Sequence, residues 1–411
     1  MHAHSRRGFL ARTLGASWAA ASLIEQSVLR AAQARAQARA SSQPILFDLE
    51  KMAEGVYAAL AKPQALLNCN AVIFENAADI LIVDAHSKSS AVAALTAQIR
   101  KELTTKPIRY VVNTHFHWDH TQGNPTYRKL APNADILSST ATRNLIADLG
   151  SARLKASVEQ ASASLDGYRR SLGAAKTAQE KAYYQEMISQ TTAYIAEMKN
   201  YAPELPNLTF DGELVLHDKA HELHLAFRGR GHTAGDVVVF CPQKKVMATG
   251  DLLHGFMPYI FDAYPRDWPK TLKSLSGLPF EQAVGGHGAI QKGRERLNQM
   301  AAYIAELTEL VESGKRQGRT AQELQASIDP SGIKSLRGTY RVYIESQIKR
   351  FDFTSAVVPP AQAVDSAVKT NIQEIYTSLD RATLSTLQKT CDGLTIARMA
   401  EPAGPTAQRK V

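Results

Sequence analysis

The chain has 411 residues, of which 44% are hydrophobic and 21% are charged, as is typical of a globular protein with a substantial core. The formal charge of +9 is concentrated at the N-terminus, because without residues 1–40 the chain has 42 basic and 38 acidic residues. With no basic run in the remainder, these numbers argue against a nucleic-acid partner.

The N-terminal segment has the organisation of a secretion signal. Paired arginines, Arg6 and Arg7, precede Phe9 and a moderately apolar run of small residues, and Ala-x-Ala sites follow within 32–38. This order resembles a twin-arginine signal peptide over residues 1–38; an amphipathic helix is the alternative. We expect a periplasmic or secreted protein that crosses the membrane already folded and keeps no stable membrane anchor once the signal is cleaved.

Strand and helix signals alternate after this segment. The apolar run ADILIVDAH (78–86) predicts a strand, SSAVAALTAQIRKEL a helix, and IRYVVNTH a second strand. Strand signals resume at ELVLHD (213–218) and continue past residue 280. Such alternation is typical of an α/β protein, in which loops at strand ends carry functional residues.

A helical pattern interrupts these strands. Apolar residues recur in steps of four and three from Leu154 to Leu172 and again from Tyr184 to Met198, with a break around SLGAAKTAQE. We therefore predict a helical-hairpin insertion over residues 146–200. Its tyrosines either pack within the hairpin or belong to a part that overhangs the functional site as a cap.

The C-terminal part, residues 301–411, is predicted to be a helical extension with a disordered tail. Its first helix, which begins near residue 293, should present one apolar face. That face would contain Met300, Ile304, Leu307 and Leu310.

The segment THFHWDH, Thr114 to His120, concentrates three histidines and an aspartate directly after an apolar strand. Alternate residues of a loop can point to the same side, so His115 and His117 can share one metal ion. Asp119 and His120 then face a neighbouring point. Imidazole and carboxylate ligands suit zinc, iron or manganese.

Remote residues must complete such a site, and three candidates follow. His232 lies in GRGHTAGD, Asp251 in ATGDLLH and His287 in VGGHGAI. Each loop contains glycine and adjoins an apolar strand, and small residues let the backbone approach a crowded centre.

In chain order these motifs resemble the signature of the metallo-β-lactamase-fold superfamily of hydrolases. That signature is an aspartate ending an early strand (here Asp84), then His-x-His-x-Asp-His, a Gly-His-Thr loop, an aspartate and a Gly-His. The resemblance implies an αββα sandwich, which we place over residues 42–300, with two zinc ions at one edge, or iron or manganese in their place. It assigns His115, His117 and His232 to one metal ion, Asp119, His120 and His287 to the second, and Asp251 to both.

The resemblance also implies a mechanism, in which a hydroxide held between the two metal ions attacks the substrate. Asp119 would be catalytic as well as a ligand, orienting the hydroxide or passing its proton to the leaving group. Asp84 would either order the ligand loop without touching metal or only cap its strand. His254, Tyr259 and Tyr264, in or beside an aromatic segment between two ligand loops, are candidate substrate contacts, the alternative being packing.

The expected function is therefore an exported dinuclear hydrolase that cleaves an ester, lactone, amide or thioester of a small molecule. The superfamily hosts many chemistries, so the fold does not choose the substrate. Asp251 matches the metal sets of glyoxalase II and lactonases and departs from the β-lactamase subclass that shares the motif, yet export keeps β-lactam hydrolysis as an alternative. A mono-iron sulfur dioxygenase-like oxidoreductase and a non-catalytic metal-binding protein are the alternatives of other classes, and the oligomeric state stays open.

Overall fold

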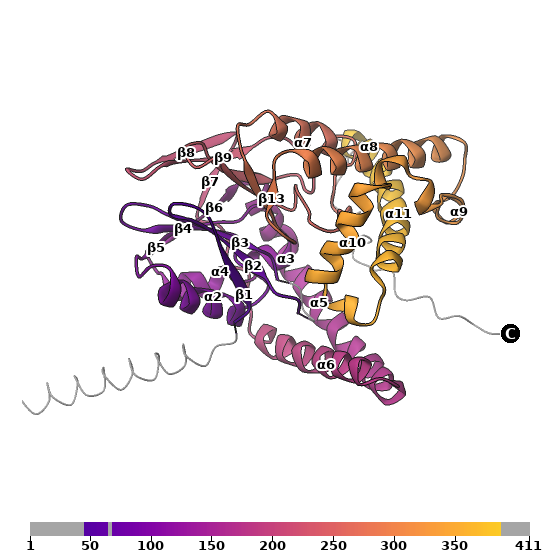
Figure 1. Cartoon of the computed structure of the whole chain (residues 1–411), viewed down its shortest axis with the longest axis horizontal. Helices are drawn as coiled ribbons and strands as arrows, with labels where there is room; N and C mark the ends of the chain where they lie inside the picture. The colour runs from indigo at the N-terminus through magenta and orange to yellow at the C-terminus, as the bar shows by residue number, and fades with distance from the viewer. Residues whose placement is uncertain (1–44, 65–67, 388–411) are drawn as a thin grey trace, which may run out of the picture.

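A computed structural model of the chain describes residues 45–64 and 68–387 (Figure 1). The signal peptide predicted over residues 1–38 and the tail predicted to be disordered lie outside these residues. Within the described part, no helix combines the length and the apolar character that a membrane span requires.

Two β-sheets form the centre of the molecule. The first has seven strands, paired in chain order, with antiparallel pairing up to the fourth strand and parallel pairing from there on. Its strands are β1 (Phe47–Ala53), β2 (Val56–Ala61), β3 (Ala71–Glu75), β4 (Ile80–Val83), β5 (Ile108–Val112), β6 (Asp135–Ser139) and β7 (Leu208–Phe210).

The second sheet has six strands in the order β13-β12-β11-β10-β9-β8, and only its β11–β12 pair is parallel among the described residues. Its strands are β8 (Glu213–His217), β9 (Glu222–Phe227), β10 (Val237–Cys241), β11 (Val246–Gly250), β12 (Gln282–Gly285) and β13 (Gln291–Lys292). Strands β10 and β11 are buried throughout, as expected of strands covered on both faces.

Helices cover the outer face of each sheet, which gives four layers. Alternation along β3 illustrates this arrangement: Val72 and Phe74 point into the core between the sheets, whereas Ile73 packs outward against helix α2 (Ser89–Glu102). Helix α4 (Asn124–Leu130) joins α2 on the first sheet, and α7 (Trp268–Ser276) and α8 (Glu295–Arg316) cover the second. The predicted αββα sandwich is confirmed.

The predicted helical hairpin is also present, between β6 and β7 (Figure 1). It consists of α5 (Thr140–Ala174) and α6 (Ala178–Met198), so the first helix begins six residues before the expected start at residue 146. The side chain of Ser139 caps α5 by accepting a hydrogen bond from the Thr142 amide. Thr177 and Glu180 form a capping box that starts α6 inside the predicted break.

The C-terminal extension is helical, as predicted, and packs against α8. Its elements are α9 (Ala321–Ser327), the short 3-10 turns η1 (Pro330–Gly332), η2 (Lys334–Leu336) and η3 (Phe353–Ala356), α10 (Thr339–Phe351) and α11 (Pro360–Leu387). The prediction that Leu310 belongs to the apolar face of α8 was wrong. Leu310 is 39% exposed, and Val311, four residues after Leu307, takes the buried position instead.

The pair Leu307 and Leu310 tests this packing. Leu307→Ala removes a fully buried side chain from the cluster that joins the second sheet to α7, α8 and α11, and should lower the free energy of unfolding by about 2–5 kcal/mol. Leu310→Ala, the same change at an exposed position of the same helix, should alter it by at most about 0.5 kcal/mol. Urea denaturation followed by circular dichroism measures both, and equal losses would contradict the packing described.

Candidate metal centre

The predicted site residues lie where strands end. His115 and His117 are in the loop after β5, which leads into the single turn α3 (Trp118–Thr121) carrying Asp119 and His120. His232 is in the loop between β9 and β10, Asp251 directly follows β11, and His287 follows β12. The two sheets therefore deliver all seven residues to one place.

A first cluster contains His115, His117, His232 and Asp251. Each offers one nitrogen or oxygen, and these four atoms lie within 4.8 Å of one another. The Nδ1 of His117 is 2.8 Å from the Nε2 of His232. All four side chains are buried, as a closed metal site requires.

A second cluster contains Asp119, His120 and His287, again within 4.8 Å of one another. The Nε2 of His287 lies 3.1 Å from the Oδ2 of Asp119. Asp251 stands between the clusters, since its Oδ1 is 3.4 Å from the Nε2 of His120 and its Oδ2 is 3.6 Å from the Nε2 of His232. One carboxylate thus reaches both groups.

The unpaired atoms of these residues fit divalent cations. The Nε2 atoms of His115 and His120 and the Oδ1 of Asp251 are buried and have no hydrogen-bond partner. Buried polar atoms without partners are rare, because each costs about 1–3 kcal/mol. A set of imidazole nitrogens and carboxylate oxygens suits zinc, iron or manganese, so the residues fit such ions without selecting among them.

The two clusters differ in charge state: the rings of His115 and His232 in the first cluster are neutral, whereas the ring of His287 in the second carries a proton that a metal ion would have to displace. Burial lowers the pKa of His115 well below its usual range and that of His232 to about 3, which leaves both rings neutral, as ligands must be. Burial opposes ionisation of Asp251, but His287 and His120 outweigh it and hold the pKa of that carboxyl well below normal. Burial likewise lowers the pKa of His287, but Asp251 and Asp119 raise it to about 9.

Asp84 holds the ring of His120 in place. Its Oδ2 accepts a hydrogen bond from the Nδ1 of His120 at 2.8 Å, and its Oδ1 accepts one from the backbone amide of Thr114. This contact fixes the tautomer of His120 and turns its Nε2 toward the second cluster. Asp84 also has a positive φ of 69°, which residues other than glycine rarely adopt.

Asp262 does the same for His117 and was missed in the sequence. Its Oδ2 accepts a hydrogen bond from the Nε2 of His117 at 2.8 Å, across 145 residues of chain. The available signal was that Asp262 is the only acidic residue between Asp251 and Asp267, within the aromatic segment that separates two ligand loops.

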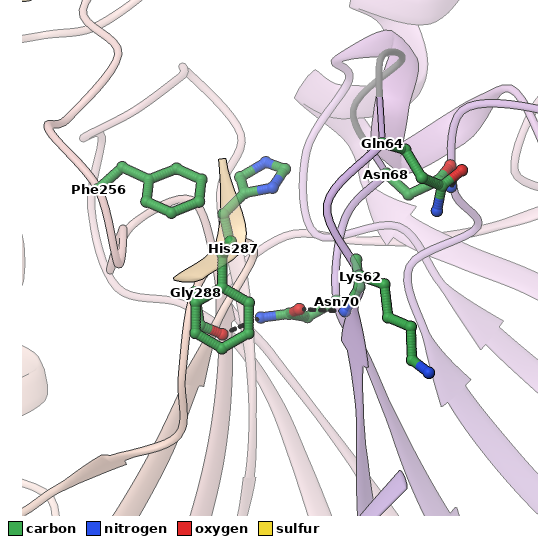
Figure 2. Close-up of a pocket in the computed structure, with 9 residues that line it drawn as sticks. Lys62, Gln64, Asn68, Asn70, Phe256, His287 and Gly288 are labelled. Carbon is green, nitrogen blue, oxygen red and sulfur yellow. Dashed lines mark hydrogen bonds between the residues drawn. The ribbon is translucent and has the colours of Figure 1, made fainter. Parts of the chain in front are cut away.

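Asn70, also missed, supports the loop that carries His287. Its side-chain amide donates to the carbonyl of Gly285. The same amide donates to the carbonyl of Gly288, and its Oδ1 accepts from the amide of Ala61 (Figure 2). The backbone on both sides of His287 is thereby tied to the first sheet.

The three candidate substrate contacts differ in position. His254 is buried, with its Nε2 3.6 Å from the Oδ2 of Asp251 and its ring 4.9 Å from that of His287. Tyr259 is 49% exposed at the rim, with its ring 6.0 Å from that of His117. Tyr264 instead packs against Arg230, whose guanidinium carbon lies 4.4 Å from the centroid of the tyrosine ring.

A small hollow, partly open to solvent, lies beside His287 (Figure 2). The ring of Phe256 stacks on the ring of His287 at one side, and Asn68 and Gln64 lie at the other. Phe351, at the end of α10, also lines it, so the C-terminal extension contributes to the surroundings of the second cluster.

The helical hairpin lies against the ligand segment. The hydroxyl of Tyr194 on α6 donates to the side chain of Gln122, and its ring is 6.1 Å from that of Trp118, inside the ligand motif. On α5, Arg153 forms an ion pair with Asp262. The hairpin therefore contacts the centre through both of its helices.

Glycine is required where these loops meet. A Cβ on Gly286 would lie 1.9 Å from the Oδ1 of Asp251 and 2.8 Å from the Cε1 of His120. At Gly250, where φ is also positive, a Cβ would lie 2.2 Å from the Oγ1 of Thr114. The close approach expected of the glycine-containing loops is thus present.

Gly286→Ala is expected to displace Asp251 and to reduce the metal bound per chain. Gly173→Ala is the matched control, because a Cβ on this residue of α5 meets nothing within 4 Å and should leave metal binding unchanged. Metal analysis after loading with zinc and gel filtration measures the outcome. A Gly286→Ala protein with the wild-type metal content would show that Asp251 does not occupy the shared position.

Comparisons with known proteins found several solved structures and one family model that match this chain. Among solved structures, a metallo-beta-lactamase from Pontibacter korlensis is 17% identical with a TM-score of 0.45, and the match covers 62% of this chain and 98% of that one. The metallo-beta-lactamase DIM-1 (17%, TM-score 0.44, 62% and 96%) and VMB-1 (16%, TM-score 0.45, 64% and 98%) are similar to the same degree. The family model described as the metallo-beta-lactamase superfamily matches residues 65–287, more than half of the chain, and the protein therefore belongs to that superfamily.

Proposed function

We propose that this protein is an exported dinuclear hydrolase, which cleaves an ester, lactone, amide or thioester bond of a small molecule. The observation that carries the proposal is the position of Asp251, whose carboxylate lies between the two clusters of ligand atoms. Its Oδ1 is 3.4 Å from the Nε2 of His120, and its Oδ2 is 3.6 Å from the Nε2 atoms of both His232 and His287. A carboxylate within reach of both clusters suits two ions held close together better than it suits a single ion.

His115, His117 and His232 would hold the first ion, and Asp119, His120 and His287 the second. Divalent cations bound there would lower the pKa of a shared water, so that it becomes the nucleophile, and would polarise the bond to be cleaved. Asp119 would accept the proton of the attacking water on a carboxylate oxygen and deliver it to the leaving group. Asp84 would keep His120 oriented for this arrangement.

His254 would donate a hydrogen bond to the substrate rather than bind metal. Its Nδ1 accepts the backbone amide proton of Phe256 at 3.2 Å, so the neutral ring carries its own proton on Nε2. This N–H faces the shared carboxylate of Asp251, beside the second cluster. It is placed to stabilise negative charge that develops on a substrate oxygen.

The hollow beside His287 favours an uncharged substrate group. Amide side chains and two phenylalanine rings dominate its described lining. The one lysine there, Lys62, lies 3.1 Å from the carboxylate of Asp48, its ion-pair partner. An acyl or lactone group with neutral hydrogen-bonding atoms suits these surroundings better than an anion does.

The predicted twin-arginine signal supports a periplasmic or secreted location for this activity. Transport in the folded state would allow the metal ions to be loaded before export. The location also keeps β-lactam hydrolysis as the second candidate, since such drugs act outside the cytoplasm.

A substrate panel tests the proposal. Purified protein with two zinc ions per chain should hydrolyse at least one of a lactone, a thioester, an ester and the β-lactam nitrocefin. Asp119→Asn should reduce kcat on the best substrate by about 10²–10⁴-fold, because proton transfer is lost. Asp166→Asn, at an exposed position of α5, is the matched control and should change nothing.

Full activity of Asp119→Asn would contradict the mechanism. One iron ion per chain, together with oxygen consumption, would favour the oxidoreductase alternative. Two zinc ions with no hydrolysis of any member of the panel would favour a metal-binding protein.

The role of His254 has its own test. His254→Phe should lower kcat by about 10²–10³-fold without lowering the metal content. His254→Gln should recover part of that loss, because its amide N–H can reach near the position of Nε2. If His254→Phe loses a metal ion, His254 is a ligand and the assignment is wrong.

A further inference from the structure

A partly buried ion pair links the helical insertion to a proposed metal ligand. The Nη1 and Nη2 atoms of Arg153, on α5, donate to the Oδ2 and Oδ1 of Asp262 at 2.7 and 2.8 Å. The same Oδ2 accepts a hydrogen bond from the Nε2 of His117 at 2.8 Å. A chain of three side chains thus runs from the insertion to the first cluster.

Aromatic rings hold the guanidinium of Arg153 in this position. It lies 4.7 Å from the ring centroid of Phe116 and 5.7 Å from that of Phe261. Phe116 separates His115 from His117 in the ligand motif, and Phe261 precedes Asp262. Arg153 therefore contacts both segments that its ion pair joins.

The geometry explains what the chain of contacts does to His117. Because the Nε2 of His117 keeps its proton and donates it in a hydrogen bond to Asp262, the lone pair of the neutral ring is on Nδ1. This atom lies 2.8 Å from the Nε2 of His232. The two hydrogen bonds from the guanidinium of Arg153 hold both oxygens of Asp262 and therefore fix the plane of the carboxylate. Without these two hydrogen bonds the carboxylate can rotate, and the ring of His117 can rotate with it.

The second cluster is held by other residues. Asp84 orients His120, and Asn70 ties the backbone on both sides of His287. Within the described part of the chain, the hydrogen bonds and ion pairs of Arg153 go to Asp262 and to neither of these supports. Its loss should consequently affect the two metal positions unequally.

We propose that Arg153 is a positioning residue that acts through Asp262 on His117, and that the helical insertion thereby sets the metal affinity of the first position and not of the second. This inference rests on the proposed dinuclear centre. It assigns to the insertion a defined task at the centre, in addition to any role in substrate access.

Variants of Arg153 can be compared in a folded protein, because the hairpin has other attachments. The ring of Tyr183 stacks on that of Phe353 at 5.1 Å, and the side chain of Gln179 donates to the carbonyl of Ala356. At the base of α6, Glu197 accepts hydrogen bonds from the amide and hydroxyl of Ser90. Thermal unfolding of the metal-free variants checks that the fold is kept.

The experiment is a zinc titration of metal-free protein in competition with a chromophoric chelator. Arg153→Met should weaken one of the two binding steps by about 10–100-fold and leave the other unchanged. Arg153→Lys should weaken the same step by less than Arg153→Met does. An ammonium group keeps the charge but cannot bind both carboxylate oxygens at once, as a guanidinium group can. Arg169→Met is the matched control, because Arg169 lies on the same helix and pairs only with the exposed Asp166 among its described ion-pair partners.

Two backgrounds show how Arg153 acts. With Asp262→Ala already present, Arg153→Met should have no further effect on zinc affinity, as required if it acts through Asp262. With His287→Ala present, Arg153→Met should weaken the remaining first position, whereas with His232→Ala present it should not weaken the second.

Equal weakening of both steps, or no weakening of either, would overturn the proposal. If Arg153→Met does not fold, the two zinc-binding steps of Arg153→Lys are compared with those of Arg169→Met instead. A wild-type protein that binds no zinc would refute the dinuclear centre itself, which separates that failure from the failure of the role of Arg153.

Discussion

The structure depends on bringing four separate loops against one carboxylate. Asp251 lies at the end of β11 and is approached by His120, His232 and His287 from three other loops. Protein interiors are close-packed, so such convergence leaves no room for a Cβ at Gly286, where the backbone itself touches the Asp251 side chain. The two sheets supply the strand ends, but the glycines decide how near the strand ends come to one another.

A buried group of histidines is held in order by acceptors that lie behind it. The Nδ1 of His120 donates to Asp84, the Nε2 of His117 to Asp262, and the Nδ1 of His232 to the carbonyl of Tyr259. In each case the bond outside the cluster decides which nitrogen faces inward. Asp84 follows β4, whereas Tyr259 and Asp262 lie three residues apart in the segment between β11 and α7, so the ligand geometry requires both sheets and that segment to be in place.

Local sequence patterns made the ligand residues and much of the fold predictable. Ligand residues within THFHWDH are neighbours in sequence, and the remote ones are marked by glycine-containing loops beside apolar strands, so the motif could be read directly. The hairpin followed from helical spacing, and the sandwich from the resemblance. Asp262 and Asn70 were not predictable, because their partners lie 145 and 215 residues away and only the tertiary structure brings them together. Leu310 was misplaced because positions 310 and 311 both continue the apolar spacing, and only the packing of the C-terminal helices decides between them.

The helical insertion and the C-terminal extension both reach the surroundings of the site. Arg153 reaches the first cluster from the insertion, and Gln347, on α10, accepts a hydrogen bond from the amide of Ala289, two residues after His287. Phe351, on the same helix, lines the hollow beside the second cluster. Since a superfamily fold hosts many reactions, the metal residues alone cannot define the substrate of this chain. The choice of substrate must depend on the residues around the two ligand clusters. In this protein the insertion and the C-terminal extension supply some of those residues.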